Sequence, residues 1–174
     1  MLLNQQKRYA LRLAALHVYV RNVKRRLHLG RSDFNICFVD DRAIRRMNAA
    51  YRGQDRATDV LSFPWGEHTR SSLAAARAGR GHHAARRPAK TRRPARAEFE
   101  GFLGDVVISV ETARRNARGE GHSTLKEIRW LILHGVLHLL GYDHESDSGE
   151  MTALELALRE QLGMAGGRGR NGSD

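Results

Sequence analysis

Three histidines, His134, His138 and His144, have the types and spacing best suited to chemistry in this sequence. On a helix, residues four apart project from the same face about one turn apart, so the first two imidazoles can bind one metal ion. Gly141 is placed to end that helix in a left-handed conformation, which turns the chain and brings His144 round as a third ligand. Three neutral nitrogens leave one coordination position open, which is typical of catalytic zinc. A lone histidine on an apolar helix is usually a core residue, but this spacing favours a metal site.

The same spacing occurs in metzincin proteases, whose pattern is His-Glu-x-x-His-x-x-Gly-x-x-His. There the glutamate takes a proton from the metal-bound water, and this sequence has Gly135 at that position. Because glycine has no side chain to accept a proton, a metallohydrolase of peptides or other substrates is the less favoured alternative. The single Cys37 excludes Cys-based zinc clusters, so the metal ligands must be histidines and carboxylates.

The histidine motif as it stands, HGVLHLLGYDH over residues 134–144, resembles the signature of the YbeY family of endoribonucleases. Residues 47–63, MNAAYRGQDRATDVLSF, are similar to that family's Asn-x-x-Tyr-Arg and Thr-Asp-Val-Leu-Ser-Phe stretches. The resemblance covers about residues 30–162 and includes Leu103–Ile108 and the Glu150–Met151 pair. Three features depart from the family: Ala57 stands where proline is usual, the N-terminal MLLNQ leaves room for only a short or missing edge strand, and one basic loop is unusually long.

The resemblance implies a metal-dependent, single-strand-specific endoribonuclease in 3′-end maturation of small-subunit (16S) rRNA and in ribosome quality control. It implies Zn²⁺, or another divalent transition metal, on His134, His138 and His144. It also implies a catalytic role for Arg52, whose position matches the arginine on which the family's activity depends. A guanidinium is permanently charged and forked, which suits it to holding a phosphodiester. The implied partners are rRNA, the pre-ribosomal small subunit, a small-subunit ribosomal protein and a ribosome-assembly GTPase, without DNA or a membrane.

Several roles stay open at this point. Asp143 either orients a ligand histidine, accepts a proton from water, or forms the turn in Gly-Tyr-Asp. The attacking group is water or the RNA's own 2′-hydroxyl. A ribosome-associated RNA-binding protein with a structural metal is the third functional class. Asp105 and Ser62 are interpreted as structural, and His122 as a helix cap or packing residue.

Hydrophobic periodicity predicts the elements that must position these residues. One apolar stripe indicates a long first helix that ends at Gly30, and it consists of Tyr9, Leu13, Leu16, Val20, Val23 and Leu27. Alternation predicts a strand over 34–39, after which Asp40 caps a helix. The inward residues of that helix are expected to be Ile44, Met47 and Tyr51. Two further strands are expected at 59–63 and 102–109.

The second half of the chain is predicted to be helical. Ser109 can cap a helix to about Arg118, and Thr124 with Glu127 has capping-box spacing for a helix from Leu125 to about Leu140. That helix is apolar nearly all round and should be buried. A second capping-box pair, Asp147 and Glu150, opens a last helix whose inward residues are Met151, Leu154, Leu158 and Leu162. Helices and strands without a strict βαβ rhythm predict an α+β domain, with a short mixed sheet packed by helices.

The 174 residues carry a formal net charge of +11, and its distribution divides the chain. Residues 66–97 hold nine Lys and Arg against the single acid Glu67 and only one large aliphatic residue, Leu73. This composition predicts a basic low-complexity insertion loop, either solvated or binding phosphates as a flexible arm. Residues 1–65 and 98–163 would form the single catalytic domain, and 164–174 a disordered tail. Without an apolar run of membrane-spanning length or a signal peptide's apolar block, a cytoplasmic location is expected.

Overall fold

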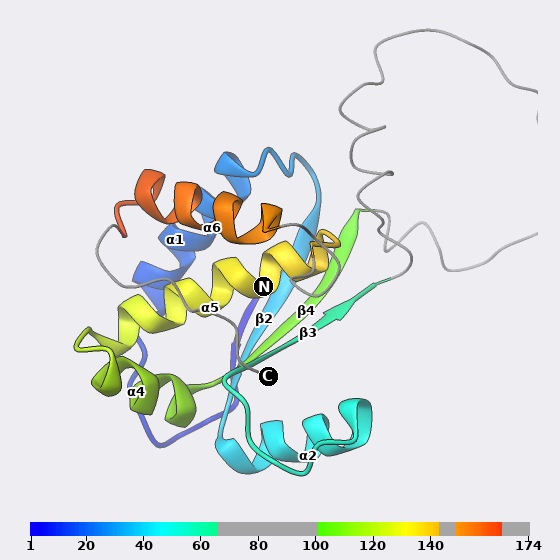
Figure 1. Ribbon diagram of the computed structural model, residues 1–174, viewed down its shortest axis with the longest axis vertical. Helices are drawn as coiled ribbons and strands as arrows, with labels where there is room; N and C mark the ends of the chain where they lie inside the picture. The colour runs from blue at the N-terminus through cyan, green and yellow to red at the C-terminus, as the bar shows by residue number, and fades with distance from the viewer. Residues whose placement is uncertain (66–100, 143–148, 165–174) are drawn as a thin grey trace, which may run out of the picture.

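Four strands form one mixed sheet at the centre of the computed structural model, which describes residues 1–65, 101–142 and 149–164 (Figure 1). The strand order is β1-β2-β4-β3. Strands β1 (Leu2–Asn4), β2 (Asp33–Val39) and β4 (Phe102–Ser109) are parallel, whereas β3 (Val60–Pro64) runs antiparallel to β4 at one edge. The short edge strand is thus present at the N-terminus, paired with β2 over three residues. The expected insertion at 66–97 lies outside the described residues.

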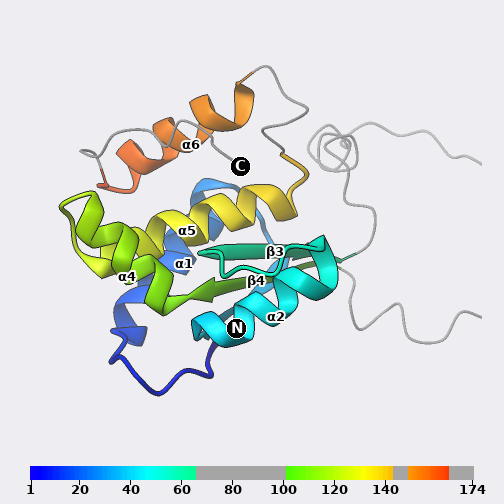
Figure 2. The same cartoon turned by 60° about the horizontal axis from the view of Figure 1, so that its bottom comes forward.

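Five helices surround this sheet within the described ranges: α1 (Leu13–Arg26), α2 (Asp41–Arg52), α4 (Val110–Gly119), α5 (Thr124–Leu139) and α6 (Glu150–Gln161). Figure 2 shows α5 lying along one face of the sheet with α6 beyond it, while α2 covers the opposite face. The predicted α+β class, mixed sheet and buried α5 are confirmed. No helix among the described residues is long and apolar enough to cross a bilayer.

The main core lies between α5 and the sheet. Its fully buried sheet residues include Phe34, Phe38 and Ile108, and α5 contributes Leu133 and Leu137. Truncating a residue such as Leu137 to alanine would cost about 2–5 kcal/mol, because a buried aliphatic loses both its transfer free energy and its packing. A second, smaller cluster under α2 contains Val39, Ile44, Leu61 and Val107. The sheet is therefore held from both faces, and most tightly by the helix that carries the histidine motif.

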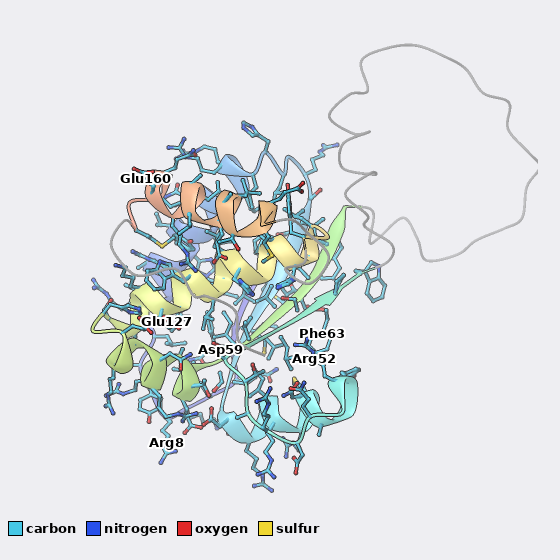
Figure 3. All side chains as sticks on the ribbon, in the orientation of Figure 1. Arg8, Arg52, Asp59, Phe63, Glu127 and Glu160 are labelled. Carbon is cyan, nitrogen blue, oxygen red and sulfur yellow. The ribbon has the colours of Figure 1, made fainter. Side chains whose placement is uncertain are left out.

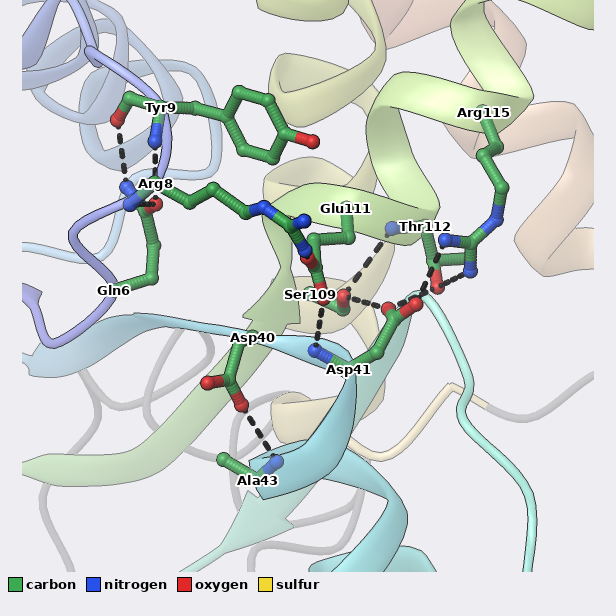
Figure 4. A network of polar contacts seen from close by, with 10 residues as sticks. All are labelled: Gln6, Arg8, Tyr9, Asp40, Asp41, Ala43, Ser109, Glu111, Thr112 and Arg115. Atoms are coloured by element: carbon green, nitrogen blue, oxygen red, sulfur yellow. Dashed lines mark hydrogen bonds and ion pairs between the residues drawn. The ribbon is translucent and has the colours of Figure 1, made fainter.

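A polar cluster, here called the Asp41 network, joins the first turns of α2 and α4 (Figure 4). It consists of Asp41, Ser109, Glu111, Thr112 and Arg115. One oxygen of Asp41 accepts from the hydroxyls of Ser109 at 2.5 Å and Thr112 at 2.7 Å, and the other lies 2.7 Å from Arg115 Nη1. Glu111 accepts from the Asp41 N–H at 2.9 Å. The network fixes α2 against the end of β4.

The first helix is shorter than predicted. It spans Leu13–Arg26, so Tyr9 precedes it, and it ends before Gly30. The buried Gln6 explains the late start, because its side-chain oxygen accepts from the N–H groups of Arg8 and Tyr9 at 2.9 Å each. Those amides are thus bound in a local turn instead of a helix. The Tyr9 ring still packs against the main core, and the Arg114 guanidinium carbon lies 4.8 Å from the centroid of the ring.

Two further predictions about helices need correction. Tyr51 was expected to face inward on α2, but it is 72 % exposed, and Asn48 is buried in its place with its amide donating to Arg56 O at 2.9 Å. The cap of α5 is Ser123, one residue before the predicted Thr124, and its hydroxyl accepts from Lys126 N. The caps predicted at Asp40 and Ser109 are confirmed, since each accepts from the N–H three residues on. Asp147 lies outside the described residues.

Candidate metal centre and active site

Helix α5 presents His134 and His138 one turn apart, with their Nε2 atoms 3.1 Å from each other. The rings are nearly perpendicular, at 74°, with centroids 4.7 Å apart. Two imidazole nitrogens about 2.0–2.1 Å from one tetrahedral zinc ion would lie about 3.4 Å apart, so this separation fits a shared metal. The structure therefore brings the first two predicted ligands together. His144, the third, and Asp143 lie outside the described residues and stay predictions.

Gly141 ends α5 as the sequence predicts. Its φ is 82°, in the left-handed region, and its N–H donates to His138 O at 2.9 Å. The N–H of Tyr142 donates to Leu137 O at 3.1 Å, which completes the paired bonds of a Schellman cap. The chain thus reverses directly after the second histidine, as a third ligand from residue 144 requires.

Gly135 lies where α5 touches the sheet most closely. A Cβ at this position would be 2.5 Å from Val106 Cγ1 and 3.1 Å from Ser62 Oγ. The Ser62 hydroxyl donates to Gly135 O at 3.2 Å, which supports its interpretation as structural. No side chain fits between α5 and the sheet here without moving them apart. The glutamate base of the metzincins is therefore excluded by packing as well as by sequence.

Behind the histidine pair lies a buried polar chain, here called the His134 relay, which runs from His134 through Glu155 to Arg159. Glu155 Oε2 on α6 is 3.3 Å from His134 Nδ1, and Glu155 Oε1 accepts from Arg159 Nη2 at 2.5 Å. Both α6 residues are buried, with 6 % and 7 % of their surface exposed. The neutral tautomer that this contact selects carries its proton on Nδ1, so the lone pair of Nε2 faces His138.

The charge of Glu155 is stabilised within the fold. Burial alone would raise the pKa of its carboxyl, but the hydrogen bond from His134, together with the charge and hydrogen bond of Arg159, outweighs burial and holds the pKa below its usual value. The Arg159 guanidinium in turn stacks 4.5 Å over the Trp130 ring, which has His122 edge-on at 4.6 Å. The interpretation of His122 as a packing residue agrees with this position.

Sequence reasoning missed Glu155 and Arg159. The signal was present, because Glu155 falls four residues after Met151 and three before Leu158, both of which are buried. A carboxylate at an inward position of an amphipathic helix needs a buried partner. The partner, His134, could not be named from the sequence, since it is on another helix 21 residues away.

Arg52 is the exposed last residue of α2, at the edge of the sheet. The neighbouring Tyr51 ring meets the Phe63 ring of β3 edge-on, with centroids 5.1 Å apart. Phe63 directly follows Ser62, which binds Gly135 of α5 from the other face. The residue before Arg52 thus contacts Phe63, and the residue after His134 contacts the adjacent Ser62 of the same strand. Figure 3 labels Arg52, at the end of α2, and Phe63, on β3.

Comparison with known proteins decides the family. The family model described as Endoribonuclease YbeY matches residues 3–163. The chain belongs to this family. The Endoribonuclease YbeY of Desulforamulus reducens is 41 % identical over 135 residues, covering 76 % of this chain and 74 % of that protein. The one from Solibacter usitatus is 37 % identical over 157 residues, covering 90 % and 84 %.

A solved structure supports the fold of this YbeY-family chain. The solution structure of TM1509 from Thermotoga maritima matches with a TM-score of 0.56 and 23 % identity, covering 93 % of this chain and 89 % of that one. At this identity the likeness establishes the shared fold. It agrees with the small α+β domain described above.

The YbeY-like segment 58–63 connects three helices to the edge of the sheet. Asp59 accepts from the Asn116 amide of α4 at 3.0 Å, Ser62 binds α5, and Phe63 contacts α2. Figure 3 shows Asp59 and Phe63 towards opposite ends of this stretch. Ala57, where the family usually has proline, packs against the smaller core cluster. The segment therefore positions both the histidine helix and the end of α2.

Proposed function

We propose that this YbeY-family chain is a metal-dependent endoribonuclease of single-stranded RNA, with one Zn²⁺ or another divalent transition metal held by His134, His138 and His144. The observation that carries the proposal is the 3.1 Å approach of two Nε2 atoms in front of a buried carboxylate. Membership of a family named for endoribonuclease activity supports RNA as the substrate. A metal bound there would polarise a phosphate oxygen or lower the pKa of bound water towards neutrality.

The protein's own groups would prepare the site before substrate binds. Glu155 accepts the Nδ1 proton of His134 and thereby directs the Nε2 lone pair towards the metal position. Arg159 holds Glu155 in place through a 2.5 Å hydrogen bond. Because all three side chains are packed between α5 and α6, little reorganisation is needed when the metal binds.

Arg52 is the proposed phosphate-binding group. Arg52 is exposed and directly follows Tyr51, whose ring contacts the edge strand β3, and β3 also contacts the histidine helix through Ser62, so this position suits a guanidinium that contacts RNA. A forked cation there would hold the phosphodiester and stabilise the charge that its oxygens gain during attack.

The Arg52→Ala variant tests this role. We expect RNA cleavage to fall by about 10²-fold or more, because one charge-stabilising group is lost, while metal content and melting temperature stay close to wild type. Arg52→Lys should recover only part of the rate, since an ammonium keeps the charge but loses the fork. If the alanine variant cleaves RNA at the wild-type rate, Arg52 has no part in the mechanism. If the variant loses its metal, the role of Arg52 is structural.

The attacking group is water or the RNA's 2′-hydroxyl, and the products distinguish them. A 2′,3′-cyclic phosphate and resistance of a 2′-deoxy-substituted strand would identify the 2′-hydroxyl. Gly135 cannot serve as the base in either case. Asp143 lies outside the described residues, so all three of its roles stay open: orienting a ligand histidine, accepting a proton from water, or forming the turn.

The proposal extends to the cell. We place the substrate in small-subunit rRNA, near its 3′ end, within cytoplasmic pre-ribosomal particles, with a small-subunit ribosomal protein and a ribosome-assembly GTPase as partners. The net charge of +11 favours such an RNA-rich environment. Mapping 16S rRNA 3′ ends in cells that depend on this chain, against the same cells carrying Arg52→Ala, would test this placement.

One assay separates the proposed function from its alternatives. The chain is tested metal-stripped and metal-replete on single-stranded RNA, duplex RNA and an unfolded protein, with a melting curve for each state. Metal-dependent cleavage of single-stranded RNA supports the proposal. Cleavage of the protein instead would indicate a metallohydrolase of another substrate. RNA binding without cleavage, together with a large metal-dependent rise in melting temperature, would indicate a binding protein with a structural metal.

A further inference from the structure

Two large aromatic side chains are exposed, one beside Arg52 at the end of α2 and one directly after β3. Tyr51 is 72 % exposed and Trp65 is 50 % exposed. Single exposed apolar residues are ordinary on protein surfaces, but these two are each supported by another ring. Tyr51 meets Phe63 edge-on at 5.1 Å, and Trp65 meets Phe102 edge-on at 6.2 Å. Rings braced in this way can present a fixed surface at low cost in side-chain entropy.

Phe63 and Trp65 lie on the same edge strand. Residues two apart on a strand are about 7 Å from each other. The ladder between β3 and β4 continues past Pro64, because the Trp65 N–H donates to Leu103 O at 2.9 Å. Trp65 therefore extends the strand beyond Phe63, whose ring packs on the smaller core cluster under α2 and meets Tyr51. Ser62 projects from the other face, towards the histidine helix.

The exposed surface of α2, which carries Tyr51, is rich in positive charge. Arg52 directly follows Tyr51, and α2 carries three further exposed arginines, Arg42, Arg45 and Arg46. Of these, Arg45 is paired with Asp55 at 2.7 Å. Exposed aromatic rings beside cations match the two faces of single-stranded RNA, whose unpaired bases stack on rings while its phosphates meet the cations. A duplex keeps its base faces inside the helix and cannot use such rings.

We propose that Tyr51, Phe63 and Trp65 form a base-stacking platform along the edge strand β3, which binds the unpaired bases of an RNA strand whose phosphate contacts Arg52. The inference rests on the proposed function and deepens it. It assigns preference for single strands to a surface separate from the metal ligands.

Binding in the presence of a metal chelator tests the platform without cleavage. Three fluorescent probes of equal length are compared: a single-stranded oligoribonucleotide, the same strand with abasic sites in its central half, and a duplex. The variants are Tyr51→Ala, Trp65→Ala and the ring-preserving Tyr51→Phe and Trp65→Phe. Val18→Ala is the control, because Val18 is 48 % exposed on α1 and its removal deletes exposed apolar surface elsewhere.

We expect each alanine variant to bind the base-bearing single strand roughly tenfold more weakly, as for loss of one base–aromatic stack. Affinity for the abasic strand should be the same for wild type and the alanine variants, and weaker than that of any single alanine variant for the normal strand, because abasic sites remove every stack at once. The phenylalanine variants and Val18→Ala should resemble wild type. The salt dependence of RNA affinity should be the same for the variants as for wild type, because no phosphate contact is removed.

Equal affinity of the wild-type chain for the normal and abasic strands would overturn the platform, as would unchanged binding by both alanine variants. The proposed function is tested separately, by measuring RNA cleavage after metal is restored. Cleavage without base-dependent binding would support the nuclease activity and contradict the platform. Base-dependent binding without cleavage, whichever divalent metal is added, would support the platform and contradict the nuclease activity. Melting curves confirm that each variant is folded, which the exposure of Tyr51 and Trp65 favours.

Discussion

The His134 relay and the Asp41 network are built from the same kinds of groups but end differently. In the Asp41 network both carboxylate oxygens accept from donors on α4 or at its cap, and Asp41 thereby closes a set of contacts between two helix starts (Figure 4). In the His134 relay the carboxylate of Glu155 accepts from a guanidinium on one side and an imidazole on the other. The far nitrogen of that imidazole faces a second imidazole nitrogen at 3.1 Å.

The difference teaches how a structural network is told from a functional one. In a closed network every hydrogen bond joins groups within the fold, and the network contributes stability. A relay that ends on two converging nitrogens directs lone pairs to one point, where a cation is the natural partner. Burial adds to the contrast, since Glu155 is almost fully buried whereas the Asp41 side chain keeps a quarter of its surface exposed. The following variants separate the metal binding proposed for the His134 relay from the stability that the Asp41 network contributes.

The largest effect is expected from His138→Ala, which removes one of the two converging nitrogens. Metal content and RNA cleavage should both be lost, while the metal-free protein keeps a melting temperature near wild type because His138 is only half-buried. Metal per chain is measured by elemental analysis after gel filtration, beside a cleavage assay. Asp41→Asn is the matched control and should retain both. A wild-type metal content in His138→Ala would contradict the site.

The next effect concerns Glu155→Gln, which keeps the size of the side chain and removes its charge. Metal affinity should fall about 10–100-fold, the usual consequence of losing the group behind a ligand histidine. Competition with a calibrated chelator measures it. Glu160→Gln on the exposed side of α6 is the control and should have no effect (Figure 3).

Because Glu155→Gln leaves Arg159 buried without its carboxylate, the variant should also lose stability, by about 3 kcal/mol or more. The double variant Glu155→Gln with Arg159→Met removes the orphaned charge and should recover much of that stability without recovering metal affinity. Recovery of both would show that Glu155 acts only through folding.

A smaller effect, on stability alone, is expected from Asp41→Ala. The loss of three contacts to a charged carboxylate should lower the free energy of unfolding by about 2 kcal/mol. Metal affinity and cleavage per folded molecule should stay at the wild-type level. Urea titration with a parallel metal assay checks both. A drop in metal affinity would show that the two networks are coupled through the sheet.

The smallest effect is the pH dependence of the contribution that Asp41 makes to the free energy of unfolding. Burial would raise the pKa of this carboxyl, but hydrogen bonds from Arg115, Ser109 and Thr112 outweigh it and lower the pKa below its usual value. A carboxyl whose pKa is lower in the folded state stabilises the protein above the ordinary carboxyl range and loses that contribution as the pH falls. Unfolding of the metal-free protein at pH 3 to 7 should therefore show a steeper acid loss for wild type than for Asp41→Asn. Parallel curves would contradict the assignment.

Local patterns were sufficient wherever the decisive contacts span a few residues. The Asp40 and Ser109 caps each bind an amide three residues on, and Gly141 completes a cap within α5. The relation of His134 to His138 follows from helical spacing alone. The same reasoning located α5 as the buried helix, because nearly every face of it is apolar. Where a side chain competes locally with the helix, as Gln6 does, periodicity misplaced the start of α1.

The sequence by itself determined the histidine motif, the family resemblance and the α+β class, because each is written in residue types at short, regular separations. Only the tertiary structure decided which carboxylate lies behind His134, since Glu155 reaches it from another helix. Packing also decided that Gly135 must lack a side chain, through the 2.5 Å approach that a Cβ would make to Val106. The exposure of Tyr51 was decided in the same way, because α2 meets the sheet through Ile44 and Asn48 and leaves that ring at the edge beside Phe63. Contacts between elements depend on how faces pack against each other, and helical periodicity carries no information on the partner.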